Sequence, residues 1–249
     1  MTGPGYIGKH RQDTQAITAI PLVRPGQVLA AQVVVIAKEP VPGRVKTRLT
    51  PPYTPAQAAA LAEAALADTL AAVGEAPVAR RVLALDGAPG GWLPPRFHVI
   101  AQRGAGLDER IAWALEDARM FVPVPVVLIG MDTPQVTPGL LTAAAEPLVS
   151  GTADATFGMA EDGGFWLLGL RETNPELLLG VPMSRPDTGS QQLLRLEQAG
   201  LRVQTLSALV DVDTAAEAER IAAAIPGSRF AARMESMRDG AERSLAATG

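Results

Sequence analysis

The sequence predicts the α/β fold class, with a mainly parallel sheet. Apolar, β-branched segments alternate along the chain with longer segments of helical periodicity, which is the order expected of strand–helix units. Two of the short segments, QVVVIA (32–37) and PVVLIG (125–130), are almost entirely apolar, as strands covered on both faces are. A chain of 249 residues buries enough surface to hold such a core without disulfides.

The other strands are predicted from the same kind of apolar or β-branched run. The link between the fifth and sixth predicted strands is the short turn EDGG, so we expect local antiparallel pairing or a break in the alternation there. The predicted strands cover residues 32–37, 80–86, 97–102, 125–130, 153–160, 165–170 and 201–206.

The predicted helices begin at recognisable capping sequences. Thr54-Pro55 and Thr137-Pro138 each place an N-cap residue before a proline in the first turn. Thr214 and Glu217 have the spacing of a capping box. The predicted helices cover residues 55–73, 107–121, 138–149, 187–199 and 214–224, and residues 229–249 form one further amphipathic helix.

The chain is expected to contain one domain. Residues 1–30 mix glycine and proline with polar residues and are interpreted as an N-terminal extension. No internal repeat or linker follows residue 30, so the domain is placed at 31–225 and a helical tail at 226–249.

Composition excludes several classes of function. The sequence has no cysteine and two histidines, which argues against disulfides, thiol nucleophiles, Cys-based zinc sites and His-based triads. A metal would therefore be held by carboxylates, which favours Mg²⁺ or Mn²⁺. The net charge of −4 gives no reason to expect nucleic-acid binding. No apolar run reaches 18 residues and no signal peptide is evident, so we expect a cytoplasmic protein without a membrane span.

A basic loop, AKEPVPGRVKTRL (37–49), follows the first predicted strand. It lies at the carboxyl end of the parallel sheet, where α/β proteins bind ligands. Backbone N–H groups and converging cations suit a polyphosphate, although a solvated basic loop is the alternative. Val45 stands where a Walker A motif has glycine. The loop contains Lys38, Gly43, Arg44, Lys46 and Arg48.

Acidic residues follow later strands. Asp132 comes two residues after the strand 125–130 and is suited to hold a metal, or to form a simple turn. The turn Asp162-Gly163-Gly164 allows a substrate to approach the backbone closely, or is an ordinary glycine turn. Asp211 and Asp213 share a face in an extended chain, although helix capping explains part of this segment.

The order of these motifs resembles the glycosyltransferase-A-type fold, also called the nucleotide-diphospho-sugar transferase fold. More closely, KEPVPGRVKTRL, GMDTP, DGGFWLLGL and DVDT resemble a bacterial family of glycosyltransferase-like proteins of the radical-SAM/selenodomain-associated type. The KTRL portion is also similar to a segment of phospholactate guanylyltransferases. The resemblance covers about 32–224 and implies a three-layer α/β/α architecture. It departs at Met183-Ser184-Arg185, where the family has Trp-Ser-Thr.

The resemblance implies roles for individual residues. The phosphates of a nucleotide would be cradled by Lys38, Gly43, Lys46, Thr47 and Arg48. Asp132 and Asp213 would hold Mg²⁺ or Mn²⁺, and Lys46, Asp132 and Asp162 would take part in catalysis. A small-molecule acceptor would lie near Asp162, Gly163, Gly164 and Ser184.

The function that these roles imply is a metal-dependent, nucleotide-using transferase. The dense cationic loop favours an NTP as donor and therefore nucleotidyl transfer. Glycosyl transfer from a nucleotide sugar is the alternative, and a non-catalytic nucleotide-binding protein is a third hypothesis.

Overall fold

The computed structural model describes the chain over residues 27–248, with side chains to residue 240. Most of the expected N-terminal extension lies outside these residues. Within them, the first strand begins at Leu29, three residues earlier than the apolar run predicts. Leu29 pairs with Val78 of the neighbouring strand, and an irregularity in the register separates this pair from the regular pairing that starts at Gln32.

The sheet has seven strands in the order β3-β2-β1-β4-β6-β5-β7. All neighbouring strands are parallel except at β6, which runs antiparallel to both β4 and β5. The predicted α/β class and the antiparallel pairing across the EDGG turn are therefore confirmed. The strands are β1 (Leu29–Lys38), β2 (Val78–Asp86), β3 (His98–Ala101), β4 (Val126–Gly130), β5 (Ala155–Ala160), β6 (Phe165–Leu170) and β7 (Val203–Leu209).

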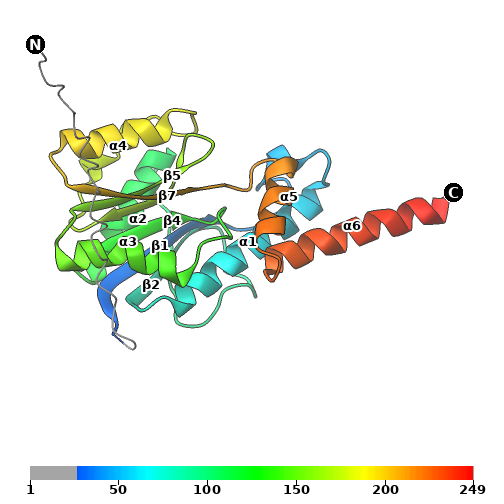
Figure 1. Ribbon diagram of the computed structural model, residues 1–249, viewed down its shortest axis with the longest axis horizontal. Coiled ribbons are helices and arrows are strands. Elements are labelled where there is room, and N and C mark those ends of the chain that lie inside the picture. Colours follow the sequence, from blue (N-terminus) through cyan, green and yellow to red (C-terminus); the bar gives the residue numbers. More distant parts are fainter. Residues whose placement is uncertain (1–26, 249) are drawn as a thin grey trace, which may run out of the picture.

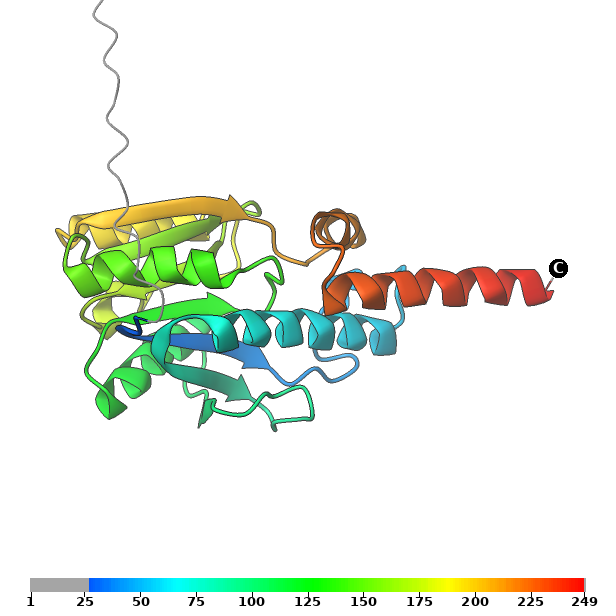
Figure 2. The same cartoon turned by 60° about the horizontal axis from the view of Figure 1, so that its bottom comes forward.

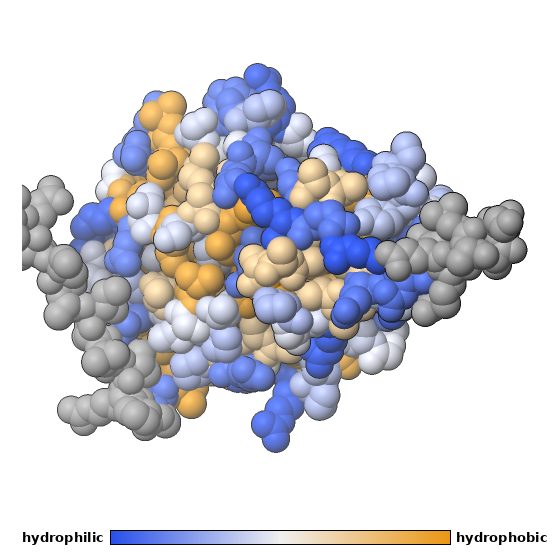
Figure 3. Space-filling model, turned by 45° about the vertical axis from the view of Figure 1, so that its right-hand side comes forward, coloured by the Kyte–Doolittle hydropathy of each residue, from blue (hydrophilic) through white to orange (hydrophobic). Residues whose placement is uncertain are grey.

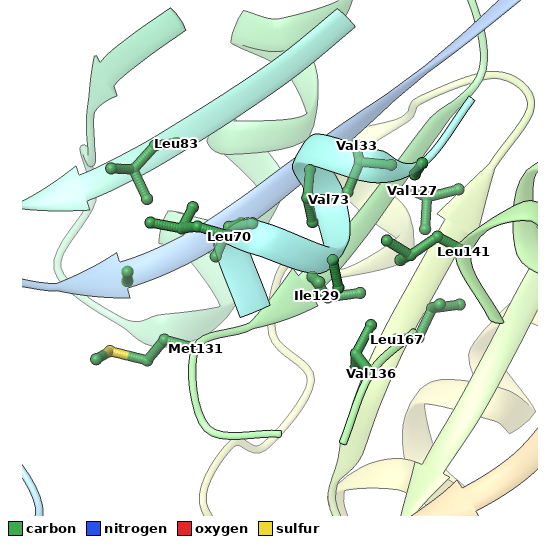
Figure 4. Packing of buried hydrophobic residues seen from close by; sticks show 14 of the residues in the cluster. Val33, Leu70, Val73, Leu83, Val127, Ile129, Met131, Val136, Leu141 and Leu167 are labelled. Carbon is green, nitrogen blue, oxygen red and sulfur yellow. The ribbon is translucent and has the colours of Figure 1, made fainter. Parts of the chain in front are cut away.

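Helices cover both faces of the sheet, which gives the three-layer architecture (Figure 1). One face is covered by the helices over residues 55–75 and 138–150 (Figure 2). Leu70 and Leu141 of these two helices pack on Val33 and Ile129 of the central strands (Figure 4). A second apolar cluster lies on the opposite face. The helices are α1 (Pro55–Glu75), α2 (Leu107–Phe121), α3 (Pro138–Ser150), α4 (Thr188–Gln198), α5 (Ala215–Ala224) and α6 (Arg229–Thr248).

The predicted helix starts are confirmed at their caps. The Thr54 side chain accepts a hydrogen bond from the N–H of Gln57, and Thr137 accepts one from Leu140. Thr214 and Glu217 form the predicted capping box at α5. These caps satisfy N–H groups that the first turn of a helix leaves without partners.

The C-terminal helix shares a third apolar cluster with α1 and α5. Phe230 and Met234 of α6 are fully buried there. The Asp68 carboxylate of α1 accepts hydrogen bonds from the backbone N–H groups of Arg229 and Phe230, at the start of α6. Beyond these contacts α6 projects away from the sheet (Figure 1).

Among the described residues, α1 alone is long and apolar enough to cross a membrane by length and composition. The expected absence of a membrane span stays a prediction. Its most apolar window is 61% buried inside the fold, because alanine and leucine side chains of α1 pack on the sheet and on α6. The apolar character of α1 is explained by core packing.

Candidate active site

A pocket of about 880 Å³ opens at the carboxyl ends of β1 and β4. Its walls come from the loop after β1, the segment that leads into α2, the turn after β4, the β5–β6 turn, the segment before α4 and the segment after β7. Figure 3 brings forward the side of the molecule that carries α5 and α6 in Figure 1, and apolar and polar surface are interspersed there. The basic loop and the acidic motifs singled out in the sequence all contribute to these walls.

Lys46 lies between two carboxylates of the pocket. Its Nζ is 2.9 Å from Oδ1 of Asp132 and 3.3 Å from Oδ1 of Asp213. The Lys46 side chain is only 7% exposed. Burial lowers the pKa of Lys46, but Asp132 and Asp213 outweigh burial and raise it above its ordinary value, so the ammonium remains charged.

Asp213 is shared between two cations. Nη1 of Arg48 donates to its Oδ2 at 2.7 Å, while Lys46 contacts the other oxygen. The Arg48 side chain is 70% exposed, so this pair is a surface contact that solvent screens. Two cations that the sequence assigns to phosphate are therefore paired with acids of the protein.

Asp211 lines the same pocket, and its pKa is strongly perturbed. Burial, together with the nearby carboxylates of Asp132, Asp162 and Asp213, raises the pKa of Asp211 to about 7, although Lys46 opposes the shift. A raised carboxyl pKa shows that negative charge is crowded at this point of the pocket.

Further cations lie at the rim of the pocket. Lys38 and Arg44 are exposed and form no ion pair within the described part of the chain. Arg110 of α2 pairs with Asp86 at 2.8 Å, and Arg185 pairs with Asp187 through two nitrogens. The sequence prediction does not include Arg110 and Arg185. The available signal for Arg185 was its departure from the family pattern, and the signal for Arg110 was the segment RGAGLDERIAWAL (103–115), which resembles the start of a helix in that family.

The acceptor side predicted from the sequence forms the other half of the pocket. Asp162 Oδ1 accepts a hydrogen bond from the Gly164 N–H at 2.8 Å, which fixes the carboxylate beside the turn. Ser184 lines the pocket and has a left-handed backbone, with φ of 58°. Phe165 and Trp166 supply apolar surface between these polar groups.

The structure brings most of the predicted site residues to this pocket, but two glycines do not line it. Gly43 lies in the turn of the basic loop at a φ of 77°, and Gly163 faces the protein. A Cβ on Gly163 would lie 1.9 Å from the carbonyl oxygen of Pro186. The close approach to the Gly163 backbone that the sequence analysis expects of a substrate is therefore made by the Pro186 carbonyl of the protein. The pocket-lining predicted residues are Lys38, Lys46, Thr47, Arg48, Asp132, Asp162, Gly164, Ser184 and Asp213.

The carboxylates of the pocket suit a divalent cation in their chemistry. Asp132 Oδ1 is buried, and its one close partner among the described residues is Lys46. Mg²⁺ is commonly held by one or two carboxylates together with substrate phosphates. Asp132 and Asp213 supply such a pair. No cluster of three or more metal-ligating side chains occurs in the described part of the chain.

Comparison with known proteins identifies the family. Residues 59–185 match the model of the family described as "Uncharacterized protein conserved in bacteria (DUF2064)". The chain belongs to this family. A search of the curated proteins finds no match to the sequence.

Among solved structures, a candidate nucleotide-diphospho-sugar transferase from Desulfovibrio desulfuricans G20 matches this DUF2064 chain over 83% of its length and 94% of its own, at 26% identity and a TM-score of 0.76. Two other solved structures match less well. A cytidylyltransferase from Leptospira borgpetersenii serovar Hardjo-bovis has 11% identity, coverage of 86% and 96%, and a TM-score of 0.49. Rv0371c from Mycobacterium tuberculosis H37Rv, in complex with manganese, has 21% identity, coverage of 78% and 98%, and a TM-score of 0.45.

Proposed function

We propose that this DUF2064 protein is a transferase whose donor is a nucleotide diphospho-sugar. The observation that carries this proposal is the pairing of Lys46 and Arg48 with acids of the pocket. The likeness to the Desulfovibrio desulfuricans protein supports a nucleotide-using transferase, and hence an enzyme.

The pairing changes the expected donor. Sequence analysis favours a triphosphate because four cations lie close together in the basic loop. In the fold, two of those cations already neutralise Asp132 and Asp213, while Lys38 and Arg44 at the rim form no ion pair with residues that the structure describes. Fewer free cations match the smaller charge of a diphosphate better.

Each half of the pocket has a part in this reaction. Lys38 and Arg44 would bind the diphosphate and hold the donor at the carboxyl ends of β1 and β4. Asp132 and Asp213 would hold Mg²⁺ or Mn²⁺, which when bound would neutralise charge on the leaving diphosphate.

Asp162 would receive the acceptor's proton. Its Oδ1 is engaged by Gly164, which leaves Oδ2 for an acceptor hydroxyl. The acceptor oxygen attacks the anomeric carbon, the bond from that carbon to the phosphate oxygen breaks, and the nucleoside diphosphate leaves with the electron pair. The hydroxyl proton passes to Asp162.

Nucleotidyl transfer is the second proposal, and the total basic charge around the pocket favours it. Arg110 and Arg185 also lie there, each beside one acid. If a triphosphate displaced these acids from their arginines, the number of available cations would rise. The acceptor would then attack the α-phosphorus and pyrophosphate would leave.

Binding and product analysis together test the two proposals. A thermal-shift panel of nucleoside triphosphates and nucleotide sugars, with and without Mn²⁺, identifies the donor class. Turnover that releases a nucleoside diphosphate supports glycosyl transfer, and release of pyrophosphate supports nucleotidyl transfer. Saturable binding without either product over a broad acceptor panel would support the non-catalytic hypothesis and contradict both.

A further inference from the structure

The position of Lys46 places a cation inside the carboxylate cluster before any ligand is bound. Its Nζ lies within 3.3 Å of both Asp132 and Asp213. Its backbone has φ of 49° and ψ of 41° at the start of the short helix Thr47–Leu49. The left-handed turn directs this side chain inward, while Arg48 stays on the surface.

The ammonium lies between the two carboxylates that are suited to a divalent cation. One site cannot accommodate both cations at full affinity, because like charges a few ångströms apart repel strongly. A metal that enters alone must therefore displace Lys46, and Lys46 then needs another anion.

The phosphates of a nucleotide provide that anion. Lys46 would then be the third loop cation at the phosphates, while Arg48 stays paired with Asp213, so the loop still offers fewer than its four cations to the donor. Lys46 lines the pocket together with Lys38 and Arg44, which are the proposed phosphate ligands.

We propose that Lys46 occupies the cation position between Asp132 and Asp213 until a nucleotide binds, so that metal and nucleotide enter as a coupled pair. The part of this inference that involves the nucleotide rests on the proposed function. The part that concerns competition between Lys46 and the metal does not.

The coupling has a measurable consequence. If Lys46 moves to the phosphates when a nucleotide binds, the nucleotide raises the affinity for Mn²⁺, and Mn²⁺ raises the affinity for the nucleotide by the same factor. Lys46 is thus a positioning residue for the two carboxylates. Its removal should raise the affinity of the nucleotide-free protein for the metal.

The first experiment is calorimetric titration of Mn²⁺ alone into the nucleotide-free protein. The variant Lys46→Met should bind Mn²⁺ on the order of tenfold or more tightly than the wild type, because a unit positive charge is removed from contact with both carboxylates. Arg44→Met is the matched control, since it removes a cation from the same loop that pairs with no acid in the described structure. Equal Mn²⁺ affinity in Lys46→Met and the wild type would overturn the proposal.

The second experiment guards against loss of folding in Lys46→Met. Mn²⁺ should raise the melting temperature of Lys46→Met more than that of the wild type, and the double variant Lys46→Met/Asp132→Asn should lose this extra shift. If Mn²⁺ still raised the melting temperature of the double variant by the extra amount, the proposed position of the metal between Asp132 and Asp213 would be contradicted.

The third experiment measures the coupling in the wild type. Titration of ADP, CDP, GDP and UDP with and without Mn²⁺ should show tighter binding of the preferred diphosphate with the metal, and Lys46→Met should reduce that factor. Failure of all four to bind would count against the proposed function, whereas an unchanged coupling factor in Lys46→Met would count against the role of Lys46.

Discussion

The backbone N–H of Val212 donates to the carbonyl oxygen of Asp132 at 3.0 Å. This bond joins the turn after β4 to the segment after β7, which are far apart in the sequence. Val212 is 1% exposed, so its side chain anchors the segment in the core while Asp211 and Asp213 lie at the pocket. The crowding of carboxylates around Lys46 therefore follows from a main-chain contact.

The buried position of Lys46 predicts a difference in stability between two neighbouring cations. Lys46→Ala should lower the free energy of unfolding by about 2 kcal/mol, because it removes a buried ammonium that bonds to the partly exposed carboxylates of Asp132 and Asp213. Arg48→Ala should cost less than about 1 kcal/mol, because its ion pair is exposed. Urea denaturation of both variants measures this difference, and equal losses would show that Lys46 is not the structural counter-ion.

This prediction differs from the one that the sequence alone supports. If Lys46 and Arg48 both pointed at the phosphates of a ligand, as the sequence indicates, replacing either would barely change stability. The sequence does not reveal the left-handed backbone at Lys46 or the acids that meet it, because Asp132 and Asp213 lie in other segments of the chain. The sequence predicts that both aspartates follow strands, but it does not predict that Lys46 contacts both of them.

The pKa of Asp211 predicts how stability depends on pH. Its pKa in the folded protein, about 7, lies above the ordinary value of 3.8, so folding favours the protonated form. The contribution of Asp211 to stability is present below about pH 4 and is lost as the pH rises to 7. In metal-free buffer, Asp211→Asn should therefore be stabilised relative to wild type at pH 8 but not at pH 4. Melting curves at both values test this, and a pH-independent difference would contradict it.

The close approach at Gly163 predicts a strong effect of a single methyl group. Gly163→Ala should destabilise the protein by more than 2 kcal/mol, on the order of the cost of strained backbone plus overpacking, because its Cβ would overlap the Pro186 carbonyl. Gly180→Ala is the matched control: Gly180 also has a positive φ, of 79°, but open space around its Cβ position, so about 1 kcal/mol is expected. Comparable losses in thermal unfolding would mean that backbone conformation alone sets the cost.

Most of the fold is predictable because its elements have clear local signals. The bounds of α2 agree with its sequence pattern at both ends, since acids begin it and a proline follows it. The strand β7 is an exception: it runs Val203–Leu209, whereas the sequence indicates 201–206. It lies at the edge of the sheet and is partly exposed along its length, so its hydrophobic pattern does not mark its ends.

Asp132 and Asp213 should act as one unit in catalysis. If both hold the metal, Asp132→Asn and Asp213→Asn should each reduce turnover on the order of a hundredfold to a thousandfold, and the double variant should be little worse than either. Asparagine keeps the volume of the side chain, so folding should persist. Steady-state rates of the three variants decide this, and near-normal turnover of Asp213→Asn would restrict Asp213 to its structural contacts with Lys46 and Arg48.

The most direct measurement is calorimetric titration of ADP-, CDP-, GDP- and UDP-sugars into the protein with Mn²⁺ present, repeated with Asp132→Asn. At least one donor should bind the wild type saturably, and its affinity should fall at least about tenfold in Asp132→Asn, as expected when a charged contact worth at least 1.4 kcal/mol is lost. Absence of binding for every donor, or equal affinity in the two proteins, would contradict a nucleotide-sugar site in this pocket.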